Sequence, residues 1–220
     1  MTNFIIYYIY AYSFFVLIYL YYRISRKLCI DQRFISIDQI VYLNQRHLLA
    51  NLIMSLAIIA SAFQAGTEVK YFFFNWNENY TGLTYVFFFL AFSLSAFSAK
   101  NEIKVNAYSL IRKEKIFYLL IRVLFLVGYE FYFRIVLLQA FYFLPIAYAV
   151  VINVILYSAA HAFSGKKEMI GSVPFGFALC LLTIIHQSVW PAIMLHIILC
   201  LPYESLKLYA TKFTNKTIRI

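Results

Sequence analysis

A glutamate and an arginine lie four residues apart inside the almost uninterrupted apolar stretch 116–143, in the segment GYEFYFR. An ionisable side chain at membrane depth costs on the order of 2.5–3.5 kcal/mol, so it usually faces a protein interior or a wet cavity. Glu130 is therefore a candidate for chemistry. Because residues four apart share one face of a helix, Glu130 and Arg134 can also neutralise each other in a purely structural ion pair.

Two histidines in later apolar stretches supply the other half of an acid–base site. Glu130 precedes Pro145 by fifteen residues and His161 follows it by sixteen. A hairpin that turns at Pro145 therefore places both side chains at nearly the same depth, and a carboxylate beside an imidazole is a standard acid–base pair. His196 lies in the last apolar stretch, with Cys200 one turn further on the same face. An intramembrane histidine can also be a plain hydrogen-bond donor between helices.

The composition indicates the elements that must position these residues. The chain has 220 residues, of which 64% are hydrophobic and 13% charged, whereas soluble domains carry about a quarter charged residues. We interpret it as one all-α integral membrane domain, a polytopic bundle of about seven transmembrane helices. It comprises three N-terminal helices (1–115), a four-helix core (116–206) and a basic tail (207–220). Stretches long enough to span a bilayer are 4–22, 48–66, 82–99, 116–143, 146–163, 174–189 and 191–206.

The positive charges predict the orientation of this bundle. One alternate set of connections contains sixteen of the nineteen Lys and Arg residues, in 23–47, 100–115, 164–173 and the tail. Basic loops stay in the cytoplasm, so we expect an outside N-terminus and a cytoplasmic C-terminus in a multi-pass cell-membrane protein. The net charge of +10 therefore reflects orientation and attraction to the lipid bilayer, and no nucleic-acid partner is predicted.

The turn near Trp190 and Pro191 complicates the placement of His196. A helix that starts at this turn carries His196 only about five residues in, about 13 Å shallower than Glu130 and His161 at a rise of 1.5 Å per residue. We therefore expect the sixth and seventh spans to be short and partly re-entrant, with the turn buried against the other helices.

Three segments in this order, YEFYFR, YSAAH and SVWPAIMLHIILC, resemble the CAAX protease and bacteriocin-processing (CPBP or Abi) family over roughly residues 115–206. Its members carry Glu-Glu-x-x-x-Arg, Phe-x-x-x-His and His-x-x-x-Asn or Asp on successive core helices. The resemblance implies a glutamic-type intramembrane endopeptidase that acts on a peptide or protein at the membrane, without a metal or cofactor. A glutamate and His161 would activate water, His196 and its partner would stabilise the oxyanion, and Arg134 would orient the glutamate.

Three positions depart from the family motifs. Tyr129 stands where the first family glutamate, the general base, is expected, and Glu130 matches the second. Tyr157 replaces the phenylalanine, and Cys200 replaces the asparagine or aspartate. A phenol with a pKa near 10 is a poor base, and a thiol is a weak donor. A rewired site would use Glu130 as the base with Tyr129 or Cys200 as oxyanion donors, or Cys200 as a nucleophile.

Three functions are compatible with these residues. The first is an intramembrane endopeptidase, which the retained histidines and Arg134 favour. The second is a catalytically impaired family member that acts as a bacteriocin-immunity, partner-binding or scaffold protein, which the loss of the first glutamate favours; its polar residues would then fix helix register. The third is a small transporter or channel component that relays protons. Pairs of helices broken by Gly or Pro, typical of transporters, are absent from the sequence.

Overall fold

A computed structural model describes residues 12–16, 19, 37–64, 80–102, 112–141, 144–162 and 166–209. Every regular element within these ranges is a helix, which confirms the predicted all-α class for this part of the chain. Three segments are long and apolar enough to cross a membrane, namely Gly82–Ala99, Arg112–Leu137 and Lys166–His186. Shorter apolar helices are His47–Ile59, Ile146–His161 and Trp190–Leu206.

The helices fall on the predicted apolar stretches, with shifted ends. Their bounds are α2 Ile37–Gln64, α4 Gly82–Glu102, α5 Arg112–Glu130, a π-helix η1 Phe131–Leu137, α6 Leu138–Ala140, α7 Ile146–His161, α8 Lys166–His186 and α9 Trp190–Tyr209. Pro145 precedes the first residue of α7, as the predicted hairpin requires. Of the predicted first span, 4–22, only residues 12–16 and 19 are described, and 12–16 are helical. The predicted basic tail lies almost entirely outside the described residues.

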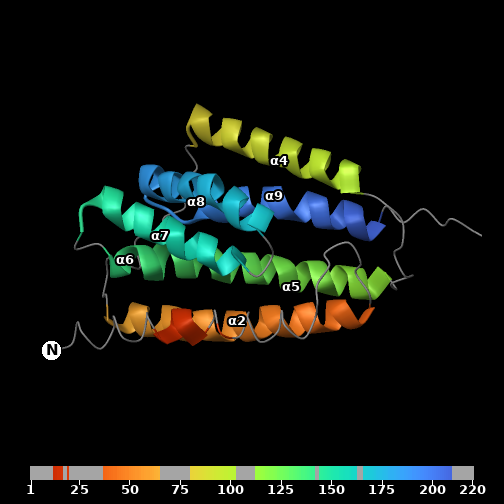
Figure 1. Ribbon diagram of the computed structural model, residues 1–220, viewed down its shortest axis with the longest axis horizontal. Helices are drawn as coiled ribbons and strands as arrows, with labels where there is room; N and C mark the ends of the chain where they lie inside the picture. The colour runs from red at the N-terminus through yellow and green to blue at the C-terminus, as the bar shows by residue number, and fades with distance from the viewer. Residues whose placement is uncertain are drawn as a thin grey trace, which may run out of the picture.

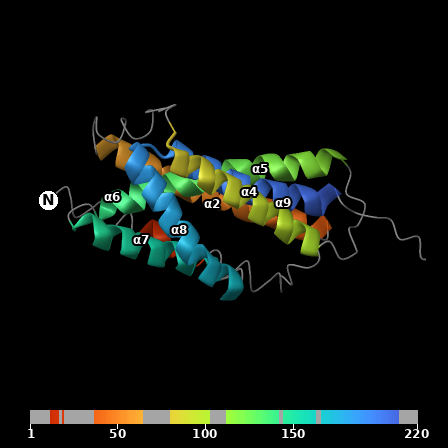
Figure 2. The ribbon, with the colours of Figure 1, turned by 90° about the horizontal axis from the view of Figure 1, so that it is seen from above.

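The described helices lie side by side along one long axis, and successive helices alternate in direction (Figure 1). α2 and α4 lie on opposite sides of the bundle, while α5 and α9 run between them. Figure 2, turned by 90°, shows α7 along one flank and α8 running obliquely to the other helices. The pairs in contact include α2 with α5, α4 with α9, α5 with α9 and α7 with α8. The two central helices therefore carry Glu130 and His196.

The turn between α8 and α9 is buried inside the bundle. Ser188 and Val189, which form it, are each exposed by 1% or less, so the predicted burial of this turn is confirmed. The prediction of a short sixth span is wrong, because Lys166–His186 is long and apolar enough to cross a membrane. The predicted short seventh span agrees with the structure, in which the apolar part of α9, Trp190–Leu206, is one of the shorter helices. α8 begins well before the predicted start of its span and contains Pro174 within it. A buried turn lets α9 begin deep in the protein.

A π-helix begins directly after Glu130. At the end of η1 the backbone N–H of Leu138 bonds to the carbonyls of Ile135 and Phe133, three and five residues earlier, whereas an α-helix bonds four residues back. Such π segments are rare and occur frequently at functional sites. The wider turn determines how Arg134, in the middle of η1, faces its neighbours.

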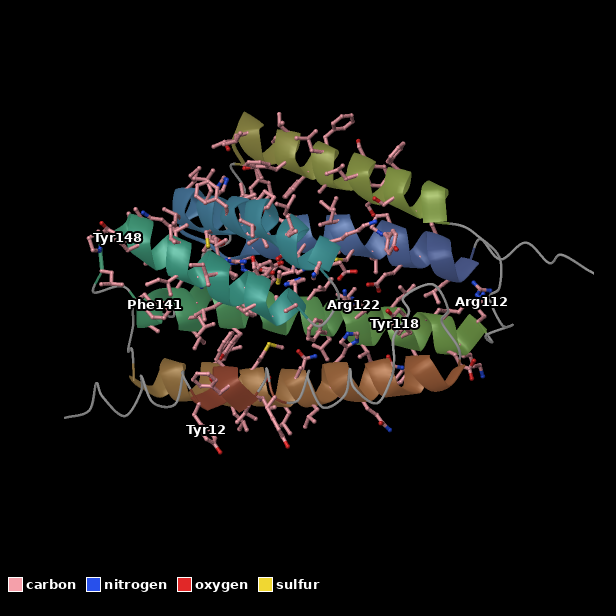
Figure 3. The ribbon with its side chains drawn as sticks, in the orientation of Figure 1. Tyr12, Arg112, Tyr118, Arg122, Phe141 and Tyr148 are labelled. Carbon is pink, nitrogen blue, oxygen red and sulfur yellow. The ribbon has the colours of Figure 1, made fainter. Side chains whose placement is uncertain are left out.

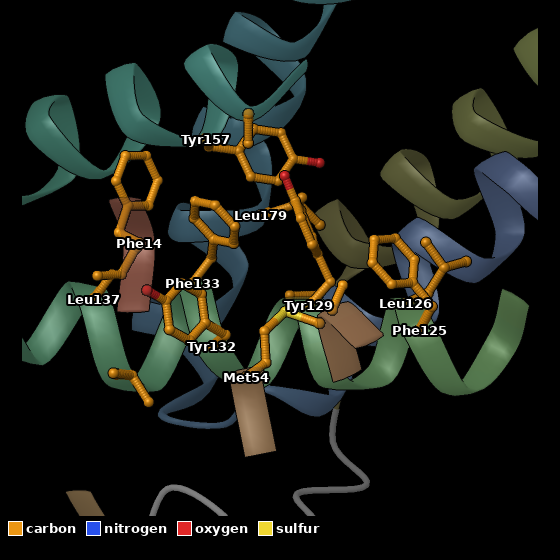
Figure 4. Packing of buried hydrophobic residues seen from close by; sticks show 14 of the residues in the cluster. Phe14, Met54, Phe125, Leu126, Tyr129, Tyr132, Phe133, Leu137, Tyr157 and Leu179 are labelled. Atoms are coloured by element: carbon orange, nitrogen blue, oxygen red, sulfur yellow. The ribbon is translucent and has the colours of Figure 1, made fainter. Parts of the chain in front are cut away.

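Aromatic rings fill the space between η1 and α7, as Figure 4 shows for Tyr129, Phe133 and Tyr157. The ring centroids of Tyr129 and Phe133 lie 4.5 Å apart, and Phe133 meets Tyr157 edge-on at 5.3 Å. Met54 of α2 closes this cluster from the other side of η1. Edge-to-face packing of this kind fixes ring orientation, so the aromatic cluster holds Tyr129 and Tyr157 in place beside the polar residues.

Two glycines of α8 give a matched test of this packing. A Cβ on Gly176 would lie 2.9 Å from Cδ1 of Tyr157, whereas a Cβ on Gly171 would meet nothing within 4 Å. We expect Gly176→Ala to lower the free energy of unfolding by about 1–3 kcal/mol through overpacking. Gly171→Ala should raise it by up to about 1 kcal/mol through helix propensity. Thermal unfolding in detergent measures both, and equal shifts for the two variants would contradict the close approach of α8 to Tyr157.

Candidate active site

Glu130, the last residue of α5, is fully buried and is bonded through both carboxylate oxygens. Its Oε2 accepts a hydrogen bond from Nε of Arg134 at 2.9 Å, and its Oε1 lies 2.5 Å from Nδ1 of His196. The arginine comes from η1, and the histidine comes from the second turn of the neighbouring α9. Glu130 therefore joins the two central helices of the bundle.

Arg134 is held by two further helices. Its Nη1 donates to Oδ1 of Asn153 on α7 at 2.5 Å and to Sγ of Cys180 on α8 at 2.9 Å. Its guanidinium carbon lies 4.8 Å from the centroid of the Tyr157 ring, which adds a cation–π contact. A buried charge is tolerated only when it is paired and hydrogen-bonded, and Arg134 receives both kinds of support from α7, α8 and Glu130.

His161, the last residue of α7, lies near Tyr129 and does not bond to Glu130. Its Nδ1 lies 2.9 Å from the backbone carbonyl of Tyr157. A carbonyl only accepts hydrogen bonds, so Nδ1 carries the proton and Nε2 of a neutral His161 keeps its lone pair. The Tyr129 ring lies 6.0 Å from the His161 ring and 6.1 Å from the His196 ring. Tyr129 thus stands between the two imidazoles.

A cavity of about 490 Å³ opens beside these rings. The residues of its wall that belong to the predicted site are Tyr129, Tyr157, His161, His196 and Cys200. Glu130 and Arg134 are not part of the wall, because they lie behind Tyr129 and His196. The cavity wall also includes Ser98 of α4, Arg122 of α5 and Glu204 of α9, toward the end of the bundle where α5 begins and α4 and α9 end, on the right in Figure 1. That end carries the connections predicted to be cytoplasmic.

The structure brings all seven residues predicted for the site into one region, with two changes of partner. The sequence predicts His161 beside Glu130, but the imidazole in contact with the carboxylate is that of His196. The expected offset of about 13 Å between His196 and Glu130 is also wrong. Both differences have one cause: the buried α8–α9 turn starts α9 deep enough for its first two turns to reach Glu130.

Two groups of functional interest were missed by sequence reasoning. Arg122 of α5 donates from Nε to Glu204 of α9 at 2.8 Å, and its Nη1 lies 3.3 Å from Nε2 of His47 on α2. Arg122 and Glu204 both line the cavity, and Figure 3 shows Arg122 on the inner side of α5. The sequence feature that could have revealed this ion pair is Arg122 itself, because a charge within an apolar span needs a partner. Asn153 gave no such signal because it is neutral.

The arrangement offers proton transfer and charge stabilisation to a molecule in the cavity. His161 presents an open Nε2, while His196 presents an imidazole supported by Glu130 and Arg134. Within the described part of the chain, no three His, Cys, Asp or Glu side chains gather closely enough to hold a metal ion. Cys200 lies one turn beyond His196 and lines the same cavity wall.

The fold and this region define a helical membrane protein with a buried carboxylate–arginine–histidine network beside a cavity. Residues 112–201 match the family model described as Type II CAAX prenyl endopeptidase Rce1-like. This match supports the resemblance of the three motifs to the CAAX protease family. The match covers all the residues predicted for the site. Comparisons with curated proteins and with solved structures gave no match.

Proposed function

We propose that this protein is an intramembrane endopeptidase that hydrolyses a peptide bond of a peptide or protein substrate at the membrane. The observation that carries the proposal is the pair of imidazoles in one cavity wall, each fixed at Nδ1 by a different partner. His161 is fixed by a carbonyl and His196 by the carboxylate of Glu130. A carbonyl leaves the first histidine a base, whereas a carboxylate supports positive charge on the second.

Hydrolysis then needs only groups of this wall and one water molecule. Nε2 of His161 accepts a proton from the water as the water oxygen attacks the carbonyl carbon of the substrate. His196, doubly protonated against Glu130, donates its remaining N–H to the oxyanion, and the Tyr129 hydroxyl is the second donor. The proton on His161 then passes to the amide nitrogen as the C–N bond breaks. The products are one carboxyl and one amine terminus.

This scheme gives Glu130 a different role from the one that the family resemblance implies. Both of its oxygens are engaged, and it lies behind the cavity wall. Glu130 therefore orients His196 and balances its charge, as the buried aspartate does for the histidine of a catalytic triad. A tyrosine at position 129 fits this scheme, because an oxyanion needs a donor and the base is supplied by His161.

The proposal is tested with the purified full chain in liposomes. The substrates are a pool of membrane-anchored peptides that includes a prenylated peptide ending in a CAAX sequence, the substrate type named in the family description. In water enriched in oxygen-18, hydrolysis places one heavy oxygen in each new carboxyl terminus, which mass spectrometry detects. We expect labelled fragments with the wild-type protein and none with the double variant His161→Asn/His196→Asn. Fragments made equally by both proteins, or by neither, would reject an endopeptidase that works through these histidines.

A further inference from the structure

Asn153 lies in the middle of α7, is fully buried, and contacts the site from behind the cavity wall. Its side-chain oxygen accepts the hydrogen bond from Nη1 of Arg134 at 2.5 Å. Its Nδ2 donates to the backbone carbonyl of Phe133 at 2.7 Å. A guanidinium only donates and a carbonyl only accepts, so the amide fits in one orientation alone.

The carbonyl that Asn153 contacts belongs to the π-helix. Phe133 already accepts the N–H of Leu138 across the widened turn of η1, and Asn153 adds a second bond to the same oxygen. One side chain therefore holds both the backbone of the π turn and the arginine that the turn carries. No charge or catalytic motif marks this residue in the sequence.

We propose that Asn153 is a positioning residue, which holds Arg134 against Glu130 and so maintains the Glu130–His196 pair in its working orientation. Besides Asn153 and Glu130, Arg134 is held only by the ring of Tyr157 and the sulfur of Cys180 among the described residues. Its Nη2 has no hydrogen-bond partner among the described residues, and Nη1 has only the sulfur of Cys180 besides Asn153. Without the amide, the guanidinium is free to turn away from the carboxylate.

Loss of Arg134 from this position would change the charge state of Glu130. The groups that face Glu130 are Arg134 from η1, His196 from α9, Tyr157 and His161 from α7, and Cys180 from α8. Arg134 is the only permanent cation among them. A fully buried carboxylate that loses its counter-charge takes up a proton. Glu130 would then no longer support positive charge on His196.

The test measures the protonation of Glu130 directly. A membrane-permeant carbodiimide modifies protonated carboxyl groups, and peptide mass spectrometry of the full chain in liposomes quantifies the adduct at Glu130. At a fixed, mildly acidic pH we expect Asn153→Leu to raise this labelling about tenfold, which corresponds to about 1.4 kcal/mol. The matched control is Ser158→Ala, because Ser158 is a buried polar residue of the same helix and its hydroxyl has no partner among the described residues. Its labelling should equal that of the wild type.

Two further variants keep the test decisive if Asn153→Leu folds poorly. Asn153→Asp keeps the size of the side chain and an acceptor for Arg134. The guanidinium is then shared between two carboxylates, and the donor to the Phe133 carbonyl is lost. Labelling of Glu130 should therefore also rise. In an Arg134→Lys background, a change at Asn153 should add nothing, because the two residues act as one unit. Unchanged labelling in Asn153→Leu and Asn153→Asp, or equal increases with and without Arg134, would overturn the proposal.

The consequence for catalysis rests on the proposed function, and the labelling does not. We expect cleavage to fall at least about tenfold in Asn153→Leu, which is typical when a residue that orients a reacting group is removed. If the wild-type protein cleaves no substrate while labelling rises as expected, the endopeptidase assignment fails and the positioning role of Asn153 stands. If the wild-type protein cleaves substrate and Asn153→Leu leaves the labelling of Glu130 unchanged, the endopeptidase assignment stands and the positioning role of Asn153 fails.

Discussion

Glu130→Gln is expected to abolish peptide cleavage and to lower the free energy of unfolding by about 3–5 kcal/mol. The amide keeps the size of the side chain but removes the negative charge between Arg134 and His196. Arg134 is then a buried cation without a counter-ion, and breaking one partner of a buried pair is costly for that reason. His196 loses the carboxylate that stabilises its doubly protonated form, which the oxyanion requires.

Chemical or thermal unfolding in detergent, together with the cleavage assay, measures both effects. Glu168→Gln is the matched control, because Glu168 is an exposed acid on the wall of the same cavity. It should change stability by no more than about 0.5 kcal/mol. A Glu130→Gln variant that is as stable as the wild type would contradict an ionic network at the centre of the bundle. If this protein has lost catalysis, Glu130→Gln should still lower the stability, but the wild-type protein itself should cleave no substrate.

The fold was predictable where local chemistry decides it. Apolar stretches of sufficient length predicted most of the helices, and Pro145 predicted the start of α7, because a proline cannot continue a helix without losing a backbone hydrogen bond. The candidate residues were predictable for a similar reason. A charge or an imidazole in an apolar span is costly enough to require a partner, so Glu130, Arg134 and His196 were identified individually.

The partners of these residues depended on tertiary packing. The burial of the α8–α9 turn sets the depth of His196, and no local pattern gives the contact between α9 and Glu130. The π turn of η1 has no sequence signature of its own, and its hydrogen-bond partner Asn153 lies nineteen residues later than Arg134. Arg122 and Glu204 are likewise joined across 82 residues. Residue types therefore revealed the participants in the site, while the helix contacts determined which pairs form.

The two histidines should respond differently to removal and to added imidazole. We expect His161→Ala to lower cleavage by about 10²–10⁴-fold, the contribution of a general base. His196→Ala should lower it by about 10²–10³-fold, the cost of one oxyanion donor. His161 is partly exposed at the end of α7 and borders the cavity, so free imidazole can occupy the space it leaves. His196 is buried against Glu130, and its loss also destabilises the bundle.

Cleavage rates with and without imidazole separate the two roles. Imidazole should restore part of the activity of His161→Ala and little of that of His196→Ala, while only His196→Ala should unfold at a lower temperature. His186→Ala is the matched control: this histidine is also buried in the bundle, but it bonds to Thr84 and does not line the cavity. The cleavage rate of the His186→Ala variant should equal that of the wild type. Full activity in His161→Ala without imidazole would show that another group takes the proton. Tyr129, whose ring lies 6.0 Å from that of His161 and 6.1 Å from that of His196, would then be the next residue to replace.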